Sequence, residues 1–234
     1  MSHAKVNSRY LLALLVISLA APMILEPRGT TAQQATLPQL EAKLEKQYAT
    51  IEDIFFNSPA KQTDPPDFRE RLRLWQDNLA KSFANAGGTI DEILKLNPPD
   101  PEKWRERSDT MWLYSQPSSP PSSRMVYGAS EVTKKARLLA PPAAESTDAA
   151  RKAKASGEVR LRVVLASDGM VKYIFPMKPL KYGLTEAAME AARKIKFERA
   201  IRFNEPASQF ATLSYEFKKG RGLPPYFPAQ EFYF

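Results

Sequence analysis

Apolar and polar residues alternate most regularly between residues 155 and 217. In the first part of this stretch, Glu158 to Leu165, every second residue is a valine or a leucine. This period of two is typical of a strand with one face on a core and the other in water. Ser167-Asp168-Gly169 predicts a tight turn, because Asp and Gly tolerate positive φ. A second strand is expected from Met170 to Met177, and Pro176, which has no amide hydrogen, places its end at a sheet edge or a bulge.

Beyond this hairpin the apolar residues recur every three or four positions. We expect a helix with Thr185 as its N-cap and with an apolar face made of Leu184, Ala188, Ala191, Ala192 and Ile195. A short extended segment should follow at Phe197 to Ile201, and the alternation returns from Ser208 to Phe217. The pattern therefore predicts an α+β fold with a β-β-α-β unit, in which a small antiparallel sheet is covered on one face by a helix.

Three stretches in this order resemble the C-terminal domain of TonB-type energy transducers: GEVRLRVVLASDGMV, GLTEAAMEAARKIKFERA and EPASQFATLSYEF. The upstream ARLLAPPAAESTDAARKAKASG is similar to the lead-in of that family, in which a turn containing Pro and a short Ala-Arg helix precede the first strand. The resemblance covers about Glu131 to Lys218. Two positions depart from the family: Ser146 stands where an aromatic residue is usual, and Phe203-Asn204-Glu205 lacks the glycine usual in the last turn.

The resemblance implies that the last strand pairs with a short segment of an outer-membrane receptor. A strand at a free sheet edge can accept an extended peptide through its backbone hydrogen bonds. We therefore expect this chain to bind envelope or outer-membrane proteins of the TonB-dependent receptor kind through the edge of its last strand. The expected binding residues are Gln209, Phe210, Ala211, Thr212, Leu213, Ser214 and Tyr215. The alternative is that this edge is covered, either by the C-terminal tail or by a second copy of the domain in a homodimer.

The first residues have the features of an export signal. Lys5 and Arg9 precede an apolar run from Leu11 to Leu25, and Thr30-Thr31-Ala32 offers small residues for cleavage. A spanning helix needs about 20 apolar residues, and this run is shorter. We expect residues 1–32 to be a cleaved signal peptide and the protein to be periplasmic or secreted. The alternative is a retained inner-membrane anchor through residues 11–25, which would make the chain a divergent transducer.

The middle of the chain is expected to be helical over residues 36–114. The spacing predicts four short helices: Leu37 to Phe55, Phe68 to a stop at Gly87-Gly88, a capped helix from Thr89 to Leu96, and one that begins at Asp100 and Pro101. A linker rich in Pro and Ser follows at residues 115–125, then the TonB-like domain at 126–218 and a Pro-rich, aromatic tail at 219–234. The tail either folds back on the helical region or stays exposed for another protein.

Composition narrows the chemistry. The chain has no cysteine and a single histidine, His3, so thiolate metal sites, cysteine nucleophiles and histidine triads are excluded. We expect no enzyme, no catalytic residue, no cofactor and no metal site. The carboxylates Asp64, Asp67 and Glu70 are better explained by the helix dipole than by a bound cation.

The net charge of +8 does not indicate nucleic acid, because the basic residues are dispersed among acidic ones and no recognition motif is present. A basic exterior instead favours anionic lipid heads, cell-wall polymers or acidic partner surfaces. The sequence thus predicts an exported, non-enzymatic protein-binding protein connected with TonB-dependent transport. The alternative is a structural module of an envelope complex, in which the helical region mediates assembly.

Overall fold

The computed structural model describes residues 35–57, 67–116 and 126–228. The expected signal or anchor segment, most of the expected linker and the last six residues lie outside these ranges. The described elements are α1 (Leu37–Phe56), α2 (Phe68–Lys95), α3 (Pro101–Ser115), β1 (Val126–Tyr127), β2 (Arg137–Leu139), α4 (Asp148–Lys152), β3 (Gly157–Leu165), β4 (Val171–Lys178), α5 (Leu184–Arg193), β5 (Lys196–Glu198), β6 (Ala200–Arg202), β7 (Glu205–Lys218) and β8 (Arg221–Gly222). None of the helices in the described ranges combines the length and the apolarity that a bilayer span requires.

The N-terminal region contains three described helices rather than the four expected, because α2 runs without a break through Gly87 and Gly88. A Cβ on Gly87 would lie 3.2 Å from Trp112 Cε2, so the missing side chain lets α3 lie close to α2. The expected capping box at Thr89 is wrong. This side chain is buried inside the helix, and its hydroxyl donates to the Asn85 carbonyl at 3.2 Å. Asp100 is the N-cap of α3, as expected.

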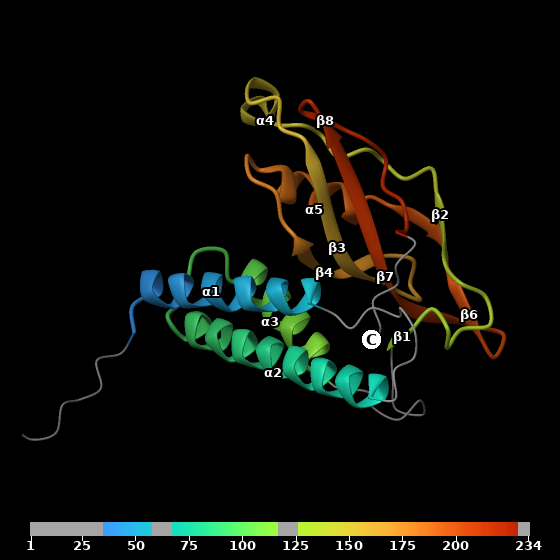
Figure 1. Ribbon diagram of the computed structural model, residues 1–234, viewed down its shortest axis with the longest axis horizontal. Coiled ribbons are helices and arrows are strands. Elements are labelled where there is room, and N and C mark those ends of the chain that lie inside the picture. The colour runs from blue at the N-terminus through green and yellow to red at the C-terminus, as the bar shows by residue number, and fades with distance from the viewer. Residues whose placement is uncertain (1–34, 58–66, 117–125, 229–234) are drawn as a thin grey trace, which may run out of the picture. The chain divides into compact units, whose positions relative to one another are not determined.

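The main sheet has the strand order β1-β7-β3-β4, and its pairs are antiparallel except for β1 with β7 (Figure 1). β3 and β7 pair from Gly157↔Phe217 to Leu165↔Gln209. β6 forms a hairpin with the start of β7 through Phe203 and Asn204, which have φ of +50° and +66° and make this turn without a glycine. β2 and β5 form a separate two-stranded sheet. The expected α+β class is confirmed: helices come first, and a largely antiparallel sheet follows.

β4 is the outermost strand on its side of the sheet, and it is irregular. Its pairing with β3 shifts register twice, and Tyr173 has φ of +51°. The Tyr114 hydroxyl of α3 donates to the Tyr173 carbonyl at 2.8 Å. Pro176 lies in this strand, so the expectation that its end falls at an edge or a bulge is confirmed. Such irregularity discourages pairing with another chain.

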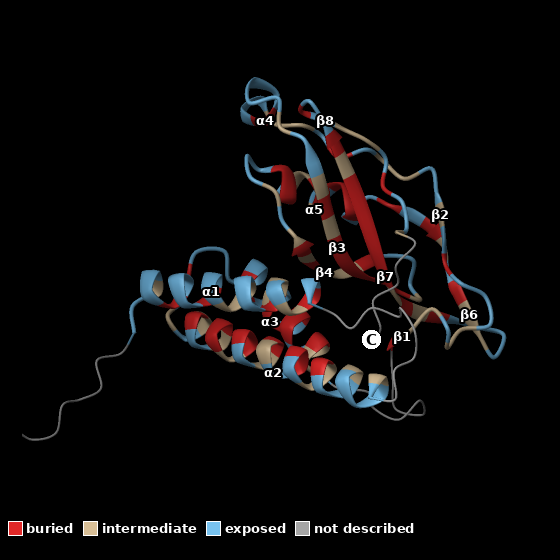
Figure 2. Ribbon diagram, in the orientation of Figure 1, coloured by how far each residue is buried: buried red, intermediate tan, exposed pale blue. Residues whose placement is uncertain are grey.

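The sheet carries helices on both faces, and Figure 2 shows that most of β3 and β7 is buried. One face packs on the alanine-rich side of α5. The other face, through Phe175 and Met177 of β4, belongs to the same hydrophobic cluster as α1, α2 and α3. Because this core is shared, the described helices and sheet belong to one compact unit, and the expectation of a helical domain separated from a C-terminal domain is wrong.

The start of α5 also differs from expectation. Gly183, with φ of +72°, is the N-cap, and Thr185 lies inside the first turn. The Thr185 hydroxyl accepts from the Leu180 amide at 2.8 Å and donates to the Leu180 carbonyl at 2.9 Å. Thr185 therefore closes the loop before the helix instead of capping it.

Candidate functional site

The strand expected to form an open edge, β7, lies in the interior of the sheet. One side pairs with β3. Along the other side, β1 pairs at Ser208 and Gln209, Tyr226 bridges Ser214, and β8 pairs at Phe217 and Lys218. The expectation of a free edge is therefore wrong, and the tail covers part of it.

The reversal of the chain after β7 explains this covering. Lys219 and Gly220 have φ of +50° and +77° and form a two-residue turn, which is the geometry of a tight hairpin. The following residues then run back beside β7. The described part of the tail thus packs along the sheet, as the alternative of an edge covered by the tail required. It neither folds back on the helical region nor stays wholly exposed.

Four of the seven predicted binding residues have buried side chains on the α5 side or at its margin. Ala211, Leu213 and Tyr215 belong to the core that packs under α5. Gln209 is also buried, and its Oε1 accepts from the Ala136 amide at 2.9 Å. These side chains hold the fold together and are almost completely shielded from solvent.

The other three predicted residues, Phe210, Thr212 and Ser214, lie on the opposite face. The Phe210 ring stands 5.7 Å from the Tyr114 ring and 5.1 Å from the Arg162 guanidinium carbon. Thr212 Oγ1 accepts from Arg162 Nη1 at 3.2 Å. Thr212 and Ser214 are buried and Phe210 is half-buried, so a partner could use the backbone of this strand but few of its side chains.

A polar cluster that the sequence did not single out lies beside the tail. We call it the tail site and define it as Glu158, Arg160, Lys178, Ser214, Glu216 and Tyr226. The two hydrogen bonds between the Ser214 and Tyr226 backbones measure 2.9 and 3.1 Å, and the Leu223 amide donates to the Glu216 carbonyl at 2.9 Å. The tail is therefore attached to β7 as a short additional strand.

Side chains of the tail site form a charged network. Glu158 Oε1 lies 3.0 Å from Arg160 Nε, and Glu158 Oε2 lies 3.4 Å from Lys178 Nζ. The Tyr226 hydroxyl donates to Glu216 Oε1 at 3.2 Å and lies 3.5 Å from Glu158 Oε1. The Glu158 side chain is only 17% exposed, so this network is one of the more enclosed charged groups of the sheet.

Two pKa shifts follow from this geometry. Partial burial opposes the ionisation of Glu158, but the hydrogen bonds and the positive charges of Arg160 and Lys178 outweigh it, so the pKa of this carboxyl lies below its usual value. Burial and the carboxylates Glu158 and Glu216 raise the pKa of the Tyr226 hydroxyl. At neutral pH the site therefore combines a charged Glu158 carboxylate with a Tyr226 phenol that keeps its proton.

The tail site carries groups that can bind an extended segment of chain. It offers backbone donors and acceptors on β7 together with fixed charges of both signs. Within the described ranges, no three metal-ligating side chains converge. One feature of the sequence could have revealed the site. Charged residues occupy Glu158, Arg160 and Glu216, which the alternation of apolar and polar residues places on the solvent face of the strands.

The chain was also compared with known proteins. No protein-family model matches it, and no curated protein matches it either.

Proposed function

We propose that the chain is a non-enzymatic binding protein that holds an extended segment of another protein at the tail site. The observation that carries the proposal is the tail itself, which lies along β7 and bonds to Ser214 and Glu216 through backbone atoms. Backbone hydrogen bonds give affinity to any extended segment, while the neighbouring side chains select among segments. A foreign segment would therefore take the place of the tail.

The partner class that fits best is an envelope protein, with TonB-dependent outer-membrane receptors as first candidates. The chain order of β3, β4, α5 and β7 supports the resemblance to the TonB C-terminal domain. That resemblance implies pairing of a receptor segment with the last long strand. The basic and apolar residues at the start of the sequence support export to the periplasm.

A partner segment can bind β7 only if its binding free energy is more favourable than that of the tail it displaces. Among the described residues beyond β8, three backbone hydrogen bonds link the tail to β7, and each contributes about 0.5–1.5 kcal/mol. A free segment pays about 4–15 kcal/mol for association. A short tether holds the tail at an effective concentration in the millimolar range, so a partner at lower concentration must bind β7 more tightly than the tail does. A partner must therefore gain affinity from side chains placed near Glu158, Arg160 and Lys178.

A peptide experiment tests the tail site. The chain is shortened after Gly222, its fold is checked by circular dichroism, and a synthetic peptide of residues 223–234 is added as the probe. We expect the peptide to bind the shortened chain and not the full chain, whose own tail fills the site. Methylating the Tyr226 amide nitrogen of the peptide removes its bond to the Ser214 carbonyl and should weaken binding about threefold to tenfold.

The matched control is the same peptide methylated at the Phe227 amide, for which the described residues show no backbone bond to β7. Equal weakening by the two methylations, or no binding of the peptide at millimolar concentration, which matches the effective concentration of the tethered tail, would contradict the tail site. Segments of TonB-dependent receptors are then tested as competitors of the bound peptide. Displacement supports the receptor class of partner. If the peptide binds but no receptor segment displaces it, that class is wrong while the tail site stands.

A further inference from the structure

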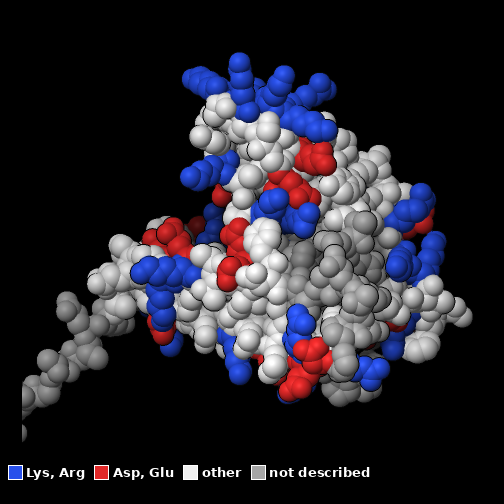
Figure 3. Space-filling view, viewed as in Figure 1, with Lys and Arg blue, Asp and Glu red and all other residues white. Residues whose placement is uncertain are grey.

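A second charged surface lies next to the tail site, at the end of the molecule where β7 ends and β3 begins. Two segments far apart in the sequence supply it: α4 with the residues after it, and the turn between β7 and β8. We define the basic end by its six exposed cations, Arg151, Lys152, Lys154, Lys218, Lys219 and Arg221. Figure 3 shows blue side chains that project together from the end carrying α4 and β8 in Figure 1.

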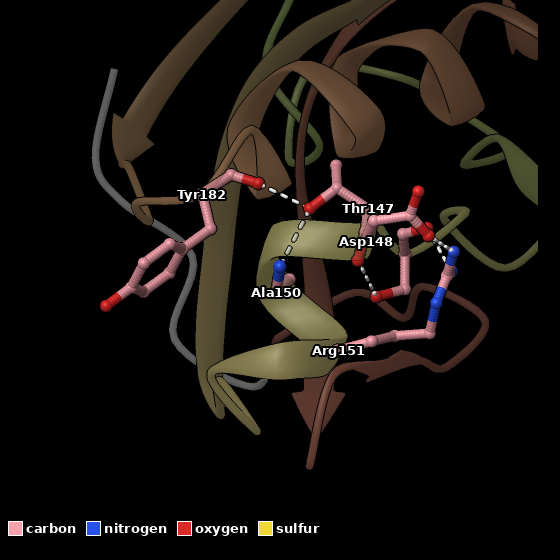
Figure 4. A network of polar contacts seen from close by, with 6 residues as sticks. Thr147, Asp148, Ala150, Arg151 and Tyr182 are labelled. Carbon is pink, nitrogen blue, oxygen red and sulfur yellow. Dashed lines mark hydrogen bonds and ion pairs between the residues drawn. The ribbon is translucent and has the colours of Figure 1, made fainter.

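The local structure of α4 explains half of this surface. The Thr147 hydroxyl accepts from the Ala150 amide at 3.0 Å and donates to the Tyr182 carbonyl at 2.6 Å (Figure 4). Ala150 is fully buried and fixes the helix on the sheet. Basic residues are favoured in the last turn by the helix dipole, and here they are Arg151 and Lys152. The helix is thus held in place with its positive side chains outward.

The second half is packed directly on the first. The Gly220 amide donates to the Ala155 carbonyl at 2.6 Å, and the Lys219 amide donates to Ser156 Oγ at 2.8 Å. A Cβ on Gly220 would lie 2.7 Å from Arg151 Cα, so only glycine permits this approach. The contact brings the two basic segments together on one rigid support.

Little local negative charge offsets these cations. In the described part of the chain, ion pairs are recorded for Arg151 with Asp148 and for Lys218 with Glu216, but none for Lys152, Lys154, Lys219 or Arg221. Lys154 and Lys219 have φ of +48° and +50°, a conformation that costs a residue with a Cβ and that Asn or Gly adopts more easily. Lysine thus occupies two turn positions for which backbone geometry does not favour it.

From these observations we infer that the basic end docks on an anionic membrane surface. Its cations project from a helix end and a hairpin turn, two convex features, whereas an acidic peptide needs a groove that orders it. The pocket of about 350 Å³ beside Arg151, Lys219 and Arg221 has room for a headgroup rather than for a length of chain. Four of the six cations are lysines, whose flexible point charges suit lipid headgroups that move laterally.

An amphipathic ring at the same end supports a lipid partner. Tyr182 is 52% exposed, and its ring points away from α4 (Figure 4). Tyrosine is enriched at membrane–water interfaces because its ring is apolar and its hydroxyl is polar.

The test is co-sedimentation of residues 35–234, which form a compact unit containing all the described hydrophobic clusters, with phosphatidylcholine vesicles that contain or lack phosphatidylglycerol. A basic side chain near an anionic surface contributes about a fivefold factor, so K152Q/K219Q should lose about 25-fold in binding to the anionic vesicles. The matched control is K81Q/K103Q, which removes the same charge from two exposed lysines of α2 and α3. It should bind as the unchanged protein does, and neutral vesicles should bind none of the three.

Equal binding by the two double variants, or no binding by the unchanged protein, would overturn the inference. Tighter binding to poly-glutamate than to vesicles, at equal anionic charge, would assign the surface to an acidic protein instead. Release by inorganic phosphate, but not by chloride of the same ionic strength, would indicate a discrete phosphate site and would equally overturn docking on a membrane. Circular dichroism of both double variants separates loss of binding from loss of fold.

Discussion

Glu158 of β3 and Glu216 of β7 are direct partners in the ladder between these strands, so two carboxylates lie opposite each other on one face of the sheet. Like charges in this position destabilise a sheet unless other groups compensate them. Here Arg160 and Lys178 lie beside Glu158, Lys218 Nζ lies 3.4 Å from Glu216 Oε2, and the Tyr226 hydroxyl reaches between the pair. The contact that attaches the tail to β7 therefore also reduces the repulsion between the Glu158 and Glu216 carboxylates.

The ionisation of Glu158 should stabilise the fold in a pH-dependent way. Its pKa is lowered in the folded chain, so the stabilisation is present above the unfolded value of about 4.3 and is lost as the pH falls through the folded value. Glu158→Gln should lower the free energy of unfolding by about 1 kcal/mol at neutral pH, a modest figure because solvent screens the pair. Denaturant titrations between pH 3 and 7 should show the difference shrinking in acid. As a control at neutral pH, Glu41→Gln, on the exposed side of α1, should change the free energy of unfolding by less than about 0.5 kcal/mol.

The Tyr226 hydroxyl should hold the tail against β7. Tyr226→Phe removes the bond to Glu216, and we expect the Ser214 amide, which donates to the Tyr226 carbonyl, to exchange its hydrogen about threefold faster. Hydrogen exchange followed by NMR measures this. The Leu213 amide is the internal control, because its register partner is Leu161 of β3, away from the tail. Equal acceleration at both amides would indicate general loosening of the sheet rather than release of the tail.

Adjacent glycines of α2 should respond in opposite ways to alanine. A Cβ on Gly88 meets nothing within 4 Å, so Gly88→Ala should stabilise the protein by about 0.5–1 kcal/mol through the better helix propensity of alanine. A Cβ on Gly87 would lie 3.2 Å from Trp112 Cε2, so Gly87→Ala should lose that gain to crowding. Thermal unfolding compares the two variants directly. A gain of the same size at both positions would contradict the close packing of α3 on α2.

The shared core predicts cooperative unfolding. The Phe175 ring of β4 lies 5.1 Å from that of Phe83 and 5.7 Å from that of Tyr48, and it is buried. Phe175→Ala should cost about 3–5 kcal/mol and should lower the stability of helices and sheet together. Far-ultraviolet circular dichroism and tryptophan fluorescence should report one transition. Phe203→Ala, at a ring that is 77% exposed, should change stability by less than about 0.5 kcal/mol.

The local pattern of apolar residues predicts the position and the buried face of a helix or strand where one face of that element packs on a single core. The alternation at Val159, Leu161 and Val163 located β3, and the residues of α5 face the core as their spacing required. Asp100 before Pro101 located the start of α3. These features depend on neighbours in the chain, so they can be inferred from the chain alone.

Features that depend on distant contacts were missed. Gly87 reads as a helix stop, and only the approach of Trp112 shows why it is tolerated inside α2. The alternation of β7 gives its faces but not its neighbours, so it could not show that the tail and β1 lie beside it. The Lys219-Gly220 turn was the one local signal for this covering, because a residue pair of that kind can close a hairpin.

The position of β7 in the sheet has a consequence for the order in which the protein can be assembled. The strand that joins β1 to β3 belongs to the last part of the chain, after both of them. During synthesis from the N-terminus, β3 cannot pair with β7 until residue 218 has been made. Fragments that end before Glu205 should accordingly aggregate, and the sheet should close in a single late step.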